Sequence, residues 1–309
     1  MRSFLLHSLL VTMSYGVAVN VGRGMVKTSL GSVGYLESDC QDPSRLPVLC
    51  FHSSPRSSDE FLEAIPLLSQ ASGSRRIVAM DVFGYGFSEN PKRSCNYDDI
   101  ADACLEAASA LGIDRFVVAG SLLGTSIALS LAARYPDRVA ACILANLYFY
   151  PPKPDGTSKG DEINKDGSIP DPWEIKEDGS HLSDLWTRRS SWLDDGLNTR
   201  VVTSELQYLA NRRIRYKKGI RIQDLSDYDF EGVARKTTCP ALCIRGEACM
   251  NFFDAIGYNG NQQFDVACGM LQDKEVVAMT GPTSTLNMIN QDPETWSKLT
   301  SDFLEEKNL

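Results

Sequence analysis

Histidine is scarce in this chain. Its 309 residues contain only His7, His52 and His181, and no histidine occurs in the C-terminal part of the chain after His181. An imidazole is the usual base that activates a serine or cysteine nucleophile, and its loss lowers the rate by orders of magnitude. An enzyme that takes its histidine base from the last third of its sequence is therefore excluded.

Excess positive charge is also absent. The formal net charge is -9 at pH 7, which argues against nucleic acid as a partner, because phosphate binding needs a basic surface. Residues 212–218 (RRIRYKK) are the local exception. We interpret this run as a solvated helix end whose cations lie near the helix C-terminus, with an anion or partner site as the alternative.

Long apolar runs and metal-ligand motifs are absent as well. No stretch after the N-terminus is apolar for long enough to span a bilayer, so no stable membrane insertion is expected. The nine cysteines include no spacing typical of metal ligands, and Cys50, Cys142 and Cys243 lie inside apolar runs, where cysteine acts as a small buried hydrophobe. We expect no metal and no cofactor.

Residues 1–24 allow two interpretations. Met1, Arg2 and Ser3 precede a short apolar stretch, and Gly16 and Ala18 are small residues as at a signal-peptidase site. Against export stand the many cysteines and the lack of an N-x-S/T acceptor. A cleaved signal peptide and an N-terminal extension both stay open, and with them a secreted or a cytoplasmic location.

The rest of the chain predicts one sizeable α/β protein. Strands and helices alternate in the manner that implies a mostly parallel sheet flanked by helices. We predict strands at 32–37, 47–53, 76–81, 116–119, 140–146, 240–247 and 275–281, and helices at 59–68, 97–111, 180–193, 198–216 and 292–304.

The most informative segment is 117–139 (VVAGSLLGTSIALSLAARYPDRV). A β-branched run leads into Gly120-Ser121-Leu122-Leu123-Gly124, and an Ala/Leu-rich helix follows. This is the strand, sharp turn and helix of a G-x-S-x-G nucleophile elbow, in which glycines flank the turn because side chains have no room there.

At this point the chain resembles the α/β-hydrolase superfamily, from about residue 25 to the C-terminus. Two further motifs carry the resemblance: residues 52–55 (HSSP) are similar to the H-G-x-P oxyanion loop, and residues 81–88 (DVFGYGFS) to the D-x-x-G-x-G-x-S loop. The resemblance implies a core formed by residues 25–147 and 237–309. A helical cap, residues 148–236, is inserted after the sixth core strand.

The three triad positions of the family appear degenerate together. Leu122 stands at the nucleophile position, Cys249 where the acid is expected, and Thr285 near the expected histidine. Leucine has no lone pair with which to attack a carbonyl. Sliding the register would make Ser121 the nucleophile, but the glycine spacing then fails.

The resemblance also suggests residues around a pocket. Ser54 and Leu123 are the expected oxyanion-hole residues, through their backbone amides. Further pocket candidates are His52, Ser53, Ser121, His181 and Trp186. His52 has a backbone-holding role as its alternative, and His181 a plain cap-helix position.

Two functions follow as hypotheses. The first is a non-hydrolytic pocket that binds a small, largely apolar organic molecule. The second is a hydrolase-like enzyme that acts on a small organic ester or related substrate and uses the amides of Ser54 and Leu123 at a non-standard site. The loop at 52–58 is also similar to that of haloalkane dehalogenases, but these need an aspartate at the elbow, which Leu122 excludes. The sequence does not specify an oligomeric state.

Overall fold

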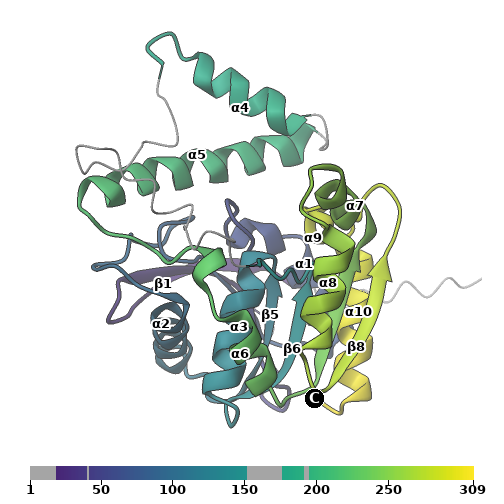
Figure 1. The fold of residues 1–309 in the computed structure, drawn as a ribbon. Helices are drawn as coiled ribbons and strands as arrows, with labels where there is room; N and C mark the ends of the chain where they lie inside the picture. Colours follow the sequence, from purple (N-terminus) through teal and green to yellow (C-terminus); the bar gives the residue numbers. More distant parts are fainter. Residues whose placement is uncertain (1–18, 40–41, 152–175, 191–194) are drawn as a thin grey trace, which may run out of the picture.

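A central sheet with helices on both faces forms the body of the molecule (Figure 1). We describe it from a computed structural model, which describes residues 19–39, 42–151, 176–190 and 195–309. Three layers, helix, sheet and helix, therefore account for most of the chain.

The sheet has eight strands in the order β1-β2-β4-β3-β5-β6-β7-β8. β1 and β2 are antiparallel to each other and β2 is antiparallel to β4, whereas all other neighbours are parallel. The predicted mostly parallel sheet is confirmed. The strands are β1 (Val21–Lys27), β2 (Ser32–Ser38), β3 (Val48–Phe51), β4 (Ile77–Met80), β5 (Phe116–Ser121), β6 (Val139–Ala145), β7 (Ala241–Gly246) and β8 (Lys274–Met279).

Alternate strand residues pack into two separate apolar layers. Leu49 and Phe51 of β3 face one cluster, and Val48 and Cys50 face the other. The inner strands are apolar on both faces because helices cover both, as parallel sheets require.

Two groups of helices cover the faces. α2 (Tyr97–Ala110), α3 (Leu123–Arg134), α6 (Phe230–Lys236) and α8 (Gly260–Gly269) pack on one face, and α1 (Ala64–Ala71), α9 (Met288–Gln291) and α10 (Pro293–Glu306) on the other. α7 (Glu247–Ala255) follows β7 directly and packs on α8. In the part of the chain that the structure describes, 3-10 helices span Ser58–Phe61 and Leu225–Asp227.

The structure differs from the predicted helix at 59–68. A 3-10 turn, Ser58–Phe61, precedes α1, which begins only at Ala64. Pro66 explains the break, because proline has no N–H for an intrahelical bond and is tolerated only in a first turn. Likewise β1 begins at Val21, four residues before the predicted start of the core, while residues 1–18 lie outside the described part.

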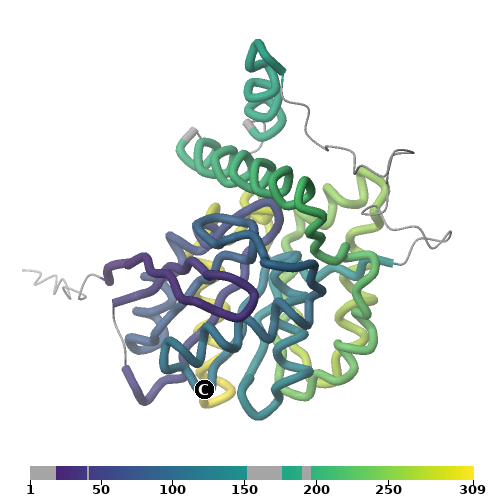
Figure 2. Tube along the Cα trace, turned by 90° about the vertical axis from the view of Figure 1, so that its left-hand side faces the viewer, coloured from purple at the N-terminus to yellow at the C-terminus, as the bar shows by residue number. Residues whose placement is uncertain are grey.

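Two helices lie beyond the end of the sheet to which the parallel strands point. α4 (Ser180–Ser190) and α5 (Asp195–Lys217) cross above the strand ends, and Figure 2 shows α4 on the outer side of α5. Most of the predicted irregular stretch before them, residues 152–175, lies outside the described residues. Within the described residues, no helix has the length and apolar character needed to cross a membrane.

Candidate functional site

The turn between β5 and α3 has the geometry of an elbow. Leu122 has φ 46° and ψ -109°, a conformation that a bulky residue adopts only when its surroundings impose it. Its N–H donates to the Ala145 carbonyl at 3.0 Å, and its own carbonyl accepts from the Thr125 N–H at 2.9 Å and from the Thr125 hydroxyl at 2.6 Å. These bonds hold the leucine at the position predicted for the nucleophile.

The two glycines that flank the elbow are required by close backbone contacts. A Cβ on Gly120 would overlap the carbonyl of Gly124, and a Cβ on Gly124 would overlap the carbonyl of Phe51. The helix therefore starts directly against β3 and β5, which explains the glycine spacing in the sequence.

Asn146 joins the ends of three neighbouring strands. It is fully buried with φ 51°, its Oδ1 accepts from the Gly246 N–H at 2.8 Å, and its Nδ2 donates to the Thr285 carbonyl at 3.2 Å. The loops after β6, β7 and β8, from which a hydrolase would take its acid and base, are thus tied together by an uncharged amide.

A cavity of about 560 Å³ lies beside the elbow. Its wall comes from the loops after β3, β4 and β6, from α2, α3, α5 and α7, and from the segments around residues 222–226 and 257–263. Seven tyrosines line it: Tyr85, Tyr97, Tyr148, Tyr150, Tyr208, Tyr216 and Tyr258. The charged side chains in its described lining are Arg212, Arg215 and Asp224.

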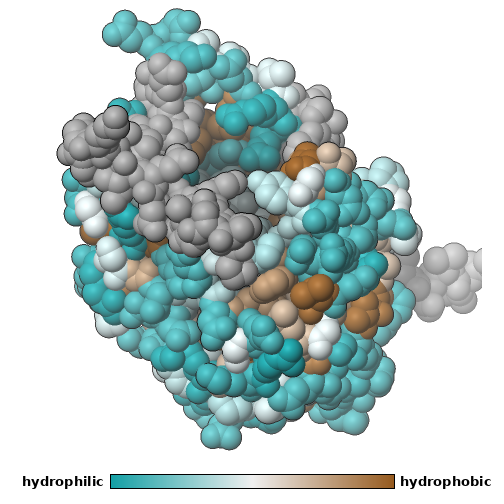
Figure 3. Space-filling model, viewed as in Figure 1, coloured by the Kyte–Doolittle hydropathy of each residue, from teal (hydrophilic) through white to brown (hydrophobic). Residues whose placement is uncertain are grey.

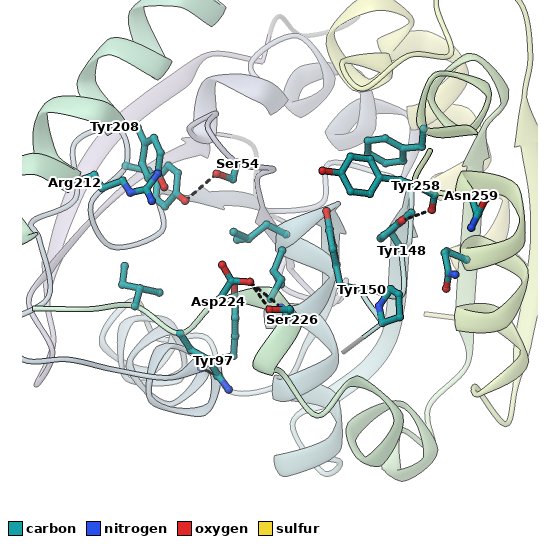
Figure 4. Close-up of a pocket in the computed structure, with 18 of the residues that line it drawn as sticks. Ser54, Tyr97, Tyr148, Tyr150, Tyr208, Arg212, Asp224, Ser226, Tyr258 and Asn259 are labelled. Atoms are coloured by element: carbon teal, nitrogen blue, oxygen red, sulfur yellow. Dashed lines mark hydrogen bonds between the residues drawn. The ribbon is translucent and has the colours of Figure 1, made fainter. Parts of the chain in front are cut away.

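Aromatic contacts fix much of this wall. The ring of Tyr208 on α5 stacks on Tyr85 at 4.4 Å, and the Tyr85 hydroxyl is 3.0 Å from the Ser54 hydroxyl. Figure 4 shows Tyr208 and Arg212 on one side of the cavity and Tyr148 and Tyr258 on the other. Burial raises the pKa of Tyr85 well above its ordinary value, so this phenol stays neutral.

Comparison with known families supports the same fold. A family described as alpha/beta hydrolase fold matches residues 47–167, which include the loop at 52–55, the loop at 81–88 and the elbow. The chain has the α/β-hydrolase fold.

Individual relatives of this α/β-hydrolase chain are distant. A 2-hydroxymuconate semialdehyde hydrolase of Pseudomonas sp. is 31% identical over 99 residues, 32% of this chain and 35% of that protein. Haloalkane dehalogenase 2 of Mycobacterium tuberculosis is 32% identical over 106 residues, 34% of this chain and 36% of that protein. The alignments span about a third of the length of these curated relatives.

Solved structures extend the likeness over the whole α/β-hydrolase fold. An esterase from Thermogutta terrifontis superposes with a TM-score of 0.68 at 16% identity and covers 93% of this chain and 100% of its own. At this identity the likeness establishes the fold and leaves the activity open.

Of the predicted site residues of this α/β-hydrolase chain, two line the cavity. Ser54 and Leu123, the expected oxyanion-hole residues, both border it. Leu123 is the first residue of α3, so its N–H has no intrahelical acceptor. Leu122 is 8% exposed and lies next to this lining without being part of it.

His52 and Ser53 are held away from the cavity. The Nδ1 atom of His52 lies 2.7 Å from the Ser53 carbonyl, and its Nε2 accepts from the Val82 N–H at 2.9 Å. Burial of the ring, which disfavours the charged imidazolium, lowers the pKa of His52 to about 4. Ser53 donates from its N–H and hydroxyl to Glu60, at 2.7 and 2.9 Å. Both residues hold the loop together, and the prediction that they border the pocket does not match the cavity found.

Ser121, Cys249 and Thr285 are also absent from the cavity lining. Ser121 is buried at the end of β5. Cys249 lies in the first turn of α7, with its N–H on the Ser284 carbonyl, and burial raises the pKa of its thiol far above the ordinary value. The hydroxyl of Thr285 donates to Gln291.

The two candidates on α4 lie on an outer helix. His181, in its first turn, accepts a hydrogen bond from the Lys176 N–H at 3.2 Å, and Trp186 is 41% exposed. Neither residue lines the cavity, and no histidine does within the described residues. His181 therefore lies on an outer helix and not at the cavity.

The sequence interpretation did not place Tyr85, Tyr97, Tyr208, Tyr216 and Tyr258, or Arg212 and Arg215, at a pocket. The run at 212–218 was expected to be a solvated helix end, but Arg215 is 3% exposed and Arg212 lines the cavity, so this interpretation is wrong for both. The spacing of Tyr208, Arg212 and Arg215 by four and three residues is the signal that places them on one face of α5.

No group of three or more His, Cys, Asp or Glu side chains suited to a metal ion occurs in the described ranges.

Proposed function

We propose that this α/β-hydrolase-fold protein binds a small, largely apolar organic molecule in the tyrosine-lined cavity and does not hydrolyse it through the elbow. The observation that carries the proposal is Leu122 in the elbow conformation, φ 46° and ψ -109°. A leucine at this position offers no nucleophile, and it adds apolar surface next to the binding cavity.

The neighbouring groups support the absence of a covalent step. Ser121 is buried and outside the cavity lining, the Cys249 thiol is buried with a raised pKa, and both ring nitrogens of His52 are engaged with backbone groups. A nucleophile needs a base within hydrogen-bond reach. The described residues that line the cavity include no histidine that could act as this base.

The cavity itself favours binding. Its volume of about 560 Å³ lies within the range of small-molecule sites, and such sites combine aromatic walls with a few polar groups. Tyrosine supplies both, a flat apolar ring and a hydroxyl. We therefore infer a ligand that spreads over several rings and meets hydroxyl groups at its edges.

A second candidate function is a hydrolase-like enzyme with a non-standard site. Ser54 and Leu123 favour it, because both line the cavity and both stand where the family places its oxyanion-hole amides. Such donors stabilise developing negative charge, each by about 10² to 10³ in rate. In the absence of a nucleophile, these amides would bind a carbonyl or carboxylate oxygen of a ligand. Their position is therefore also consistent with the first function.

Activity measurements separate the two functions. We expect no labelling by a fluorophosphonate probe and no turnover of p-nitrophenyl esters above that of the heat-unfolded protein. Ser121→Ala should leave both unchanged, since Ser121 does not line the cavity. Robust ester hydrolysis that Ser121→Ala abolishes would mean that the nucleophile is Ser121 and that the proposal is wrong.

Leu122→Ser provides the matched gain-of-function control. It restores a hydroxyl at the elbow but no base, and loss of the base costs orders of magnitude in rate. We expect the variant to stay inactive toward the esters. Efficient turnover by Leu122→Ser would reveal a base that completes the site and would favour the enzymatic alternative.

A further inference from the structure

Arg215 is a buried cation that forms no ion pair with a carboxylate of the described residues. It lies in the last turn of α5, is 3% exposed and lines the cavity. Its Nε and Nη1 atoms are buried without a hydrogen-bond partner among the described residues. Its guanidinium is in contact with one aromatic ring, Tyr216, whose centroid is 5.5 Å away. A guanidinium cannot lose its proton, so this arrangement is costly unless something else supplies acceptors.

Two other buried arginines, Arg56 and Arg75, have hydrogen-bond acceptors of the kind expected for a structural arginine. Arg56 donates to Asn290 at 2.7 Å and to Asn287, and Arg75 donates to the carbonyls of Leu46 and Leu309 at 2.5 and 2.6 Å. Arg215 has no comparable acceptor within the described part of the chain. The Nη1 atom of Arg215 and the Oδ1 atom of Asn90 both lie close to Gly84, but no hydrogen bond joins the two atoms. Arg56 and Arg75 each leave only Nε without a partner, whereas Arg215 leaves both Nε and Nη1 without one among the described residues.

The cavity as a whole carries excess positive charge. Arg212 lies one turn before Arg215, and its Nε donates to the Tyr216 hydroxyl at 3.1 Å. The carboxylate in the described lining is Asp224, whose Oδ1 already accepts from the N–H and hydroxyl of Ser226 at 3.0 and 2.8 Å. The described lining therefore holds two arginine cations and one carboxylate, which already accepts two hydrogen bonds from Ser226. The cavity is a positively charged site inside a protein of net charge -9.

We propose that the ligand is an organic acid, whose carboxylate or phosphate group binds Arg215 and Arg212 and whose apolar, mainly aromatic body lies among the tyrosines. This inference rests on the proposed function, because it specifies the ligand of the same cavity. Arginine matches the planar, two-oxygen edge of a carboxylate or phosphate, and such charge-assisted bonds are stronger than neutral ones. Tyr97, Tyr148 and Tyr150 provide ring surface in the same cavity for the body of the ligand.

Calorimetry with three matched naphthalene derivatives tests the proposal. The full-length protein is titrated with 2-naphthoate, 2-naphthyl phosphate and neutral 2-naphthamide. We expect at least one of the two acids to bind about tenfold or more tighter than the amide, as hydrogen bonds to a charged group imply. Comparison of carboxylate with phosphate then identifies the oxyanion.

Arg215→Met should remove the preference for the acid and leave the affinity for 2-naphthamide within about threefold. Lys217→Gln is the control, because it also lowers the charge by one at the end of α5 but is exposed and outside the lining. It should keep the preference. Retention of the preference in Arg215→Met, or its loss in Lys217→Gln, would overturn the assignment to Arg215.

The thermal stability of the ligand-free protein gives an independent readout. Replacing an unpaired buried charge by an apolar side chain of similar length should leave the melting temperature of Arg215→Met unchanged or raise it, whereas removing a structural ion pair would lower it. A marked fall would assign Arg215 a structural role and overturn the inference. Equal binding of acids and amide by the wild type would also overturn it and leave the proposed function standing. Absence of binding by all three compounds would count against both.

Discussion

At the scale of single residues, the elbow depends on the absence of two side chains. A Cβ at position 124 would overlap the Phe51 carbonyl, which belongs to a central strand and has no room to move. We predict that Gly124→Ala lowers the free energy of unfolding by at least about 3 kcal/mol, because backbone must shift to relieve the overlap. Urea denaturation followed by circular dichroism measures this change.

Gly269→Ala is the matched control for this substitution. Gly269 is the last residue of α8, it is exposed, and a Cβ there would meet nothing within 4 Å. The alanine should be neutral or stabilising by up to about 1 kcal/mol, since glycine is a poor helix former. Recovery of Gly124→Ala with the same stability as Gly269→Ala would contradict the close approach of α3 to β3.

At the scale of elements, Asn146 holds the ends of β6, β7 and β8 in register around the cavity edge. Asn146→Gly keeps the positive φ but removes the bonds to Gly246 and Thr285, and should cost about 2–4 kcal/mol because buried backbone groups lose their partners. Asn146→Ala should cost about 1 kcal/mol more, since alanine is strained at this φ. Urea midpoints of the two variants and the wild type give both differences.

The order of the two variants is the informative result. If Asn146→Gly and Asn146→Ala lower the free energy of unfolding equally, the left-handed backbone at position 146 imposes no strain on alanine. If Asn146→Gly unfolds at the wild-type urea concentration, the amide does not join the strand ends.

At the scale of the whole molecule, the fold was predictable from sequence and the cavity was not. Gly120 and Gly124 mark the elbow because local backbone geometry demands them, and the apolar strands follow from burial on both faces. Leu122 was placed correctly in the sharp turn for the same reason. Such features depend on short stretches of chain, which a sequence pattern records directly.

The cavity depends on residues far apart in sequence, from Ser54 to Gln263, and no local pattern records their meeting. The basic run at 212–218 illustrates the difficulty, since its composition indicates solvent whereas tertiary packing buries Arg215. Surface composition offers little help: the face in Figure 3 is mainly hydrophilic with small separate apolar areas. The position of a charged helix end is decided by what packs against it.

Acid stability is a property of the whole molecule to which the buried side chain of His52 should contribute. The folded protein holds His52 neutral, with its pKa lowered to about 4 by burial, whereas the unfolded chain has the ordinary value of about 6.5. The unfolded state therefore binds the extra proton as pH falls from 6.5 to 4, and the free energy of unfolding decreases through this window. The expected loss from this group is about 2 kcal/mol between pH 7 and pH 5.

The variant His52→Gln isolates this contribution. Its amide offers an acceptor toward the Val82 N–H and a donor toward the Ser53 carbonyl but does not titrate. Asp81, whose pKa is raised by burial, acts in the opposite direction but is present in both proteins, so it cancels in the difference. Urea denaturation of both proteins at pH 7, 6 and 5 should show the stability advantage of the wild type shrinking by about 2 kcal/mol over this range. Parallel profiles would show that His52 carries the same charge in the folded and unfolded states, and that its two backbone contacts do not hold a neutral ring.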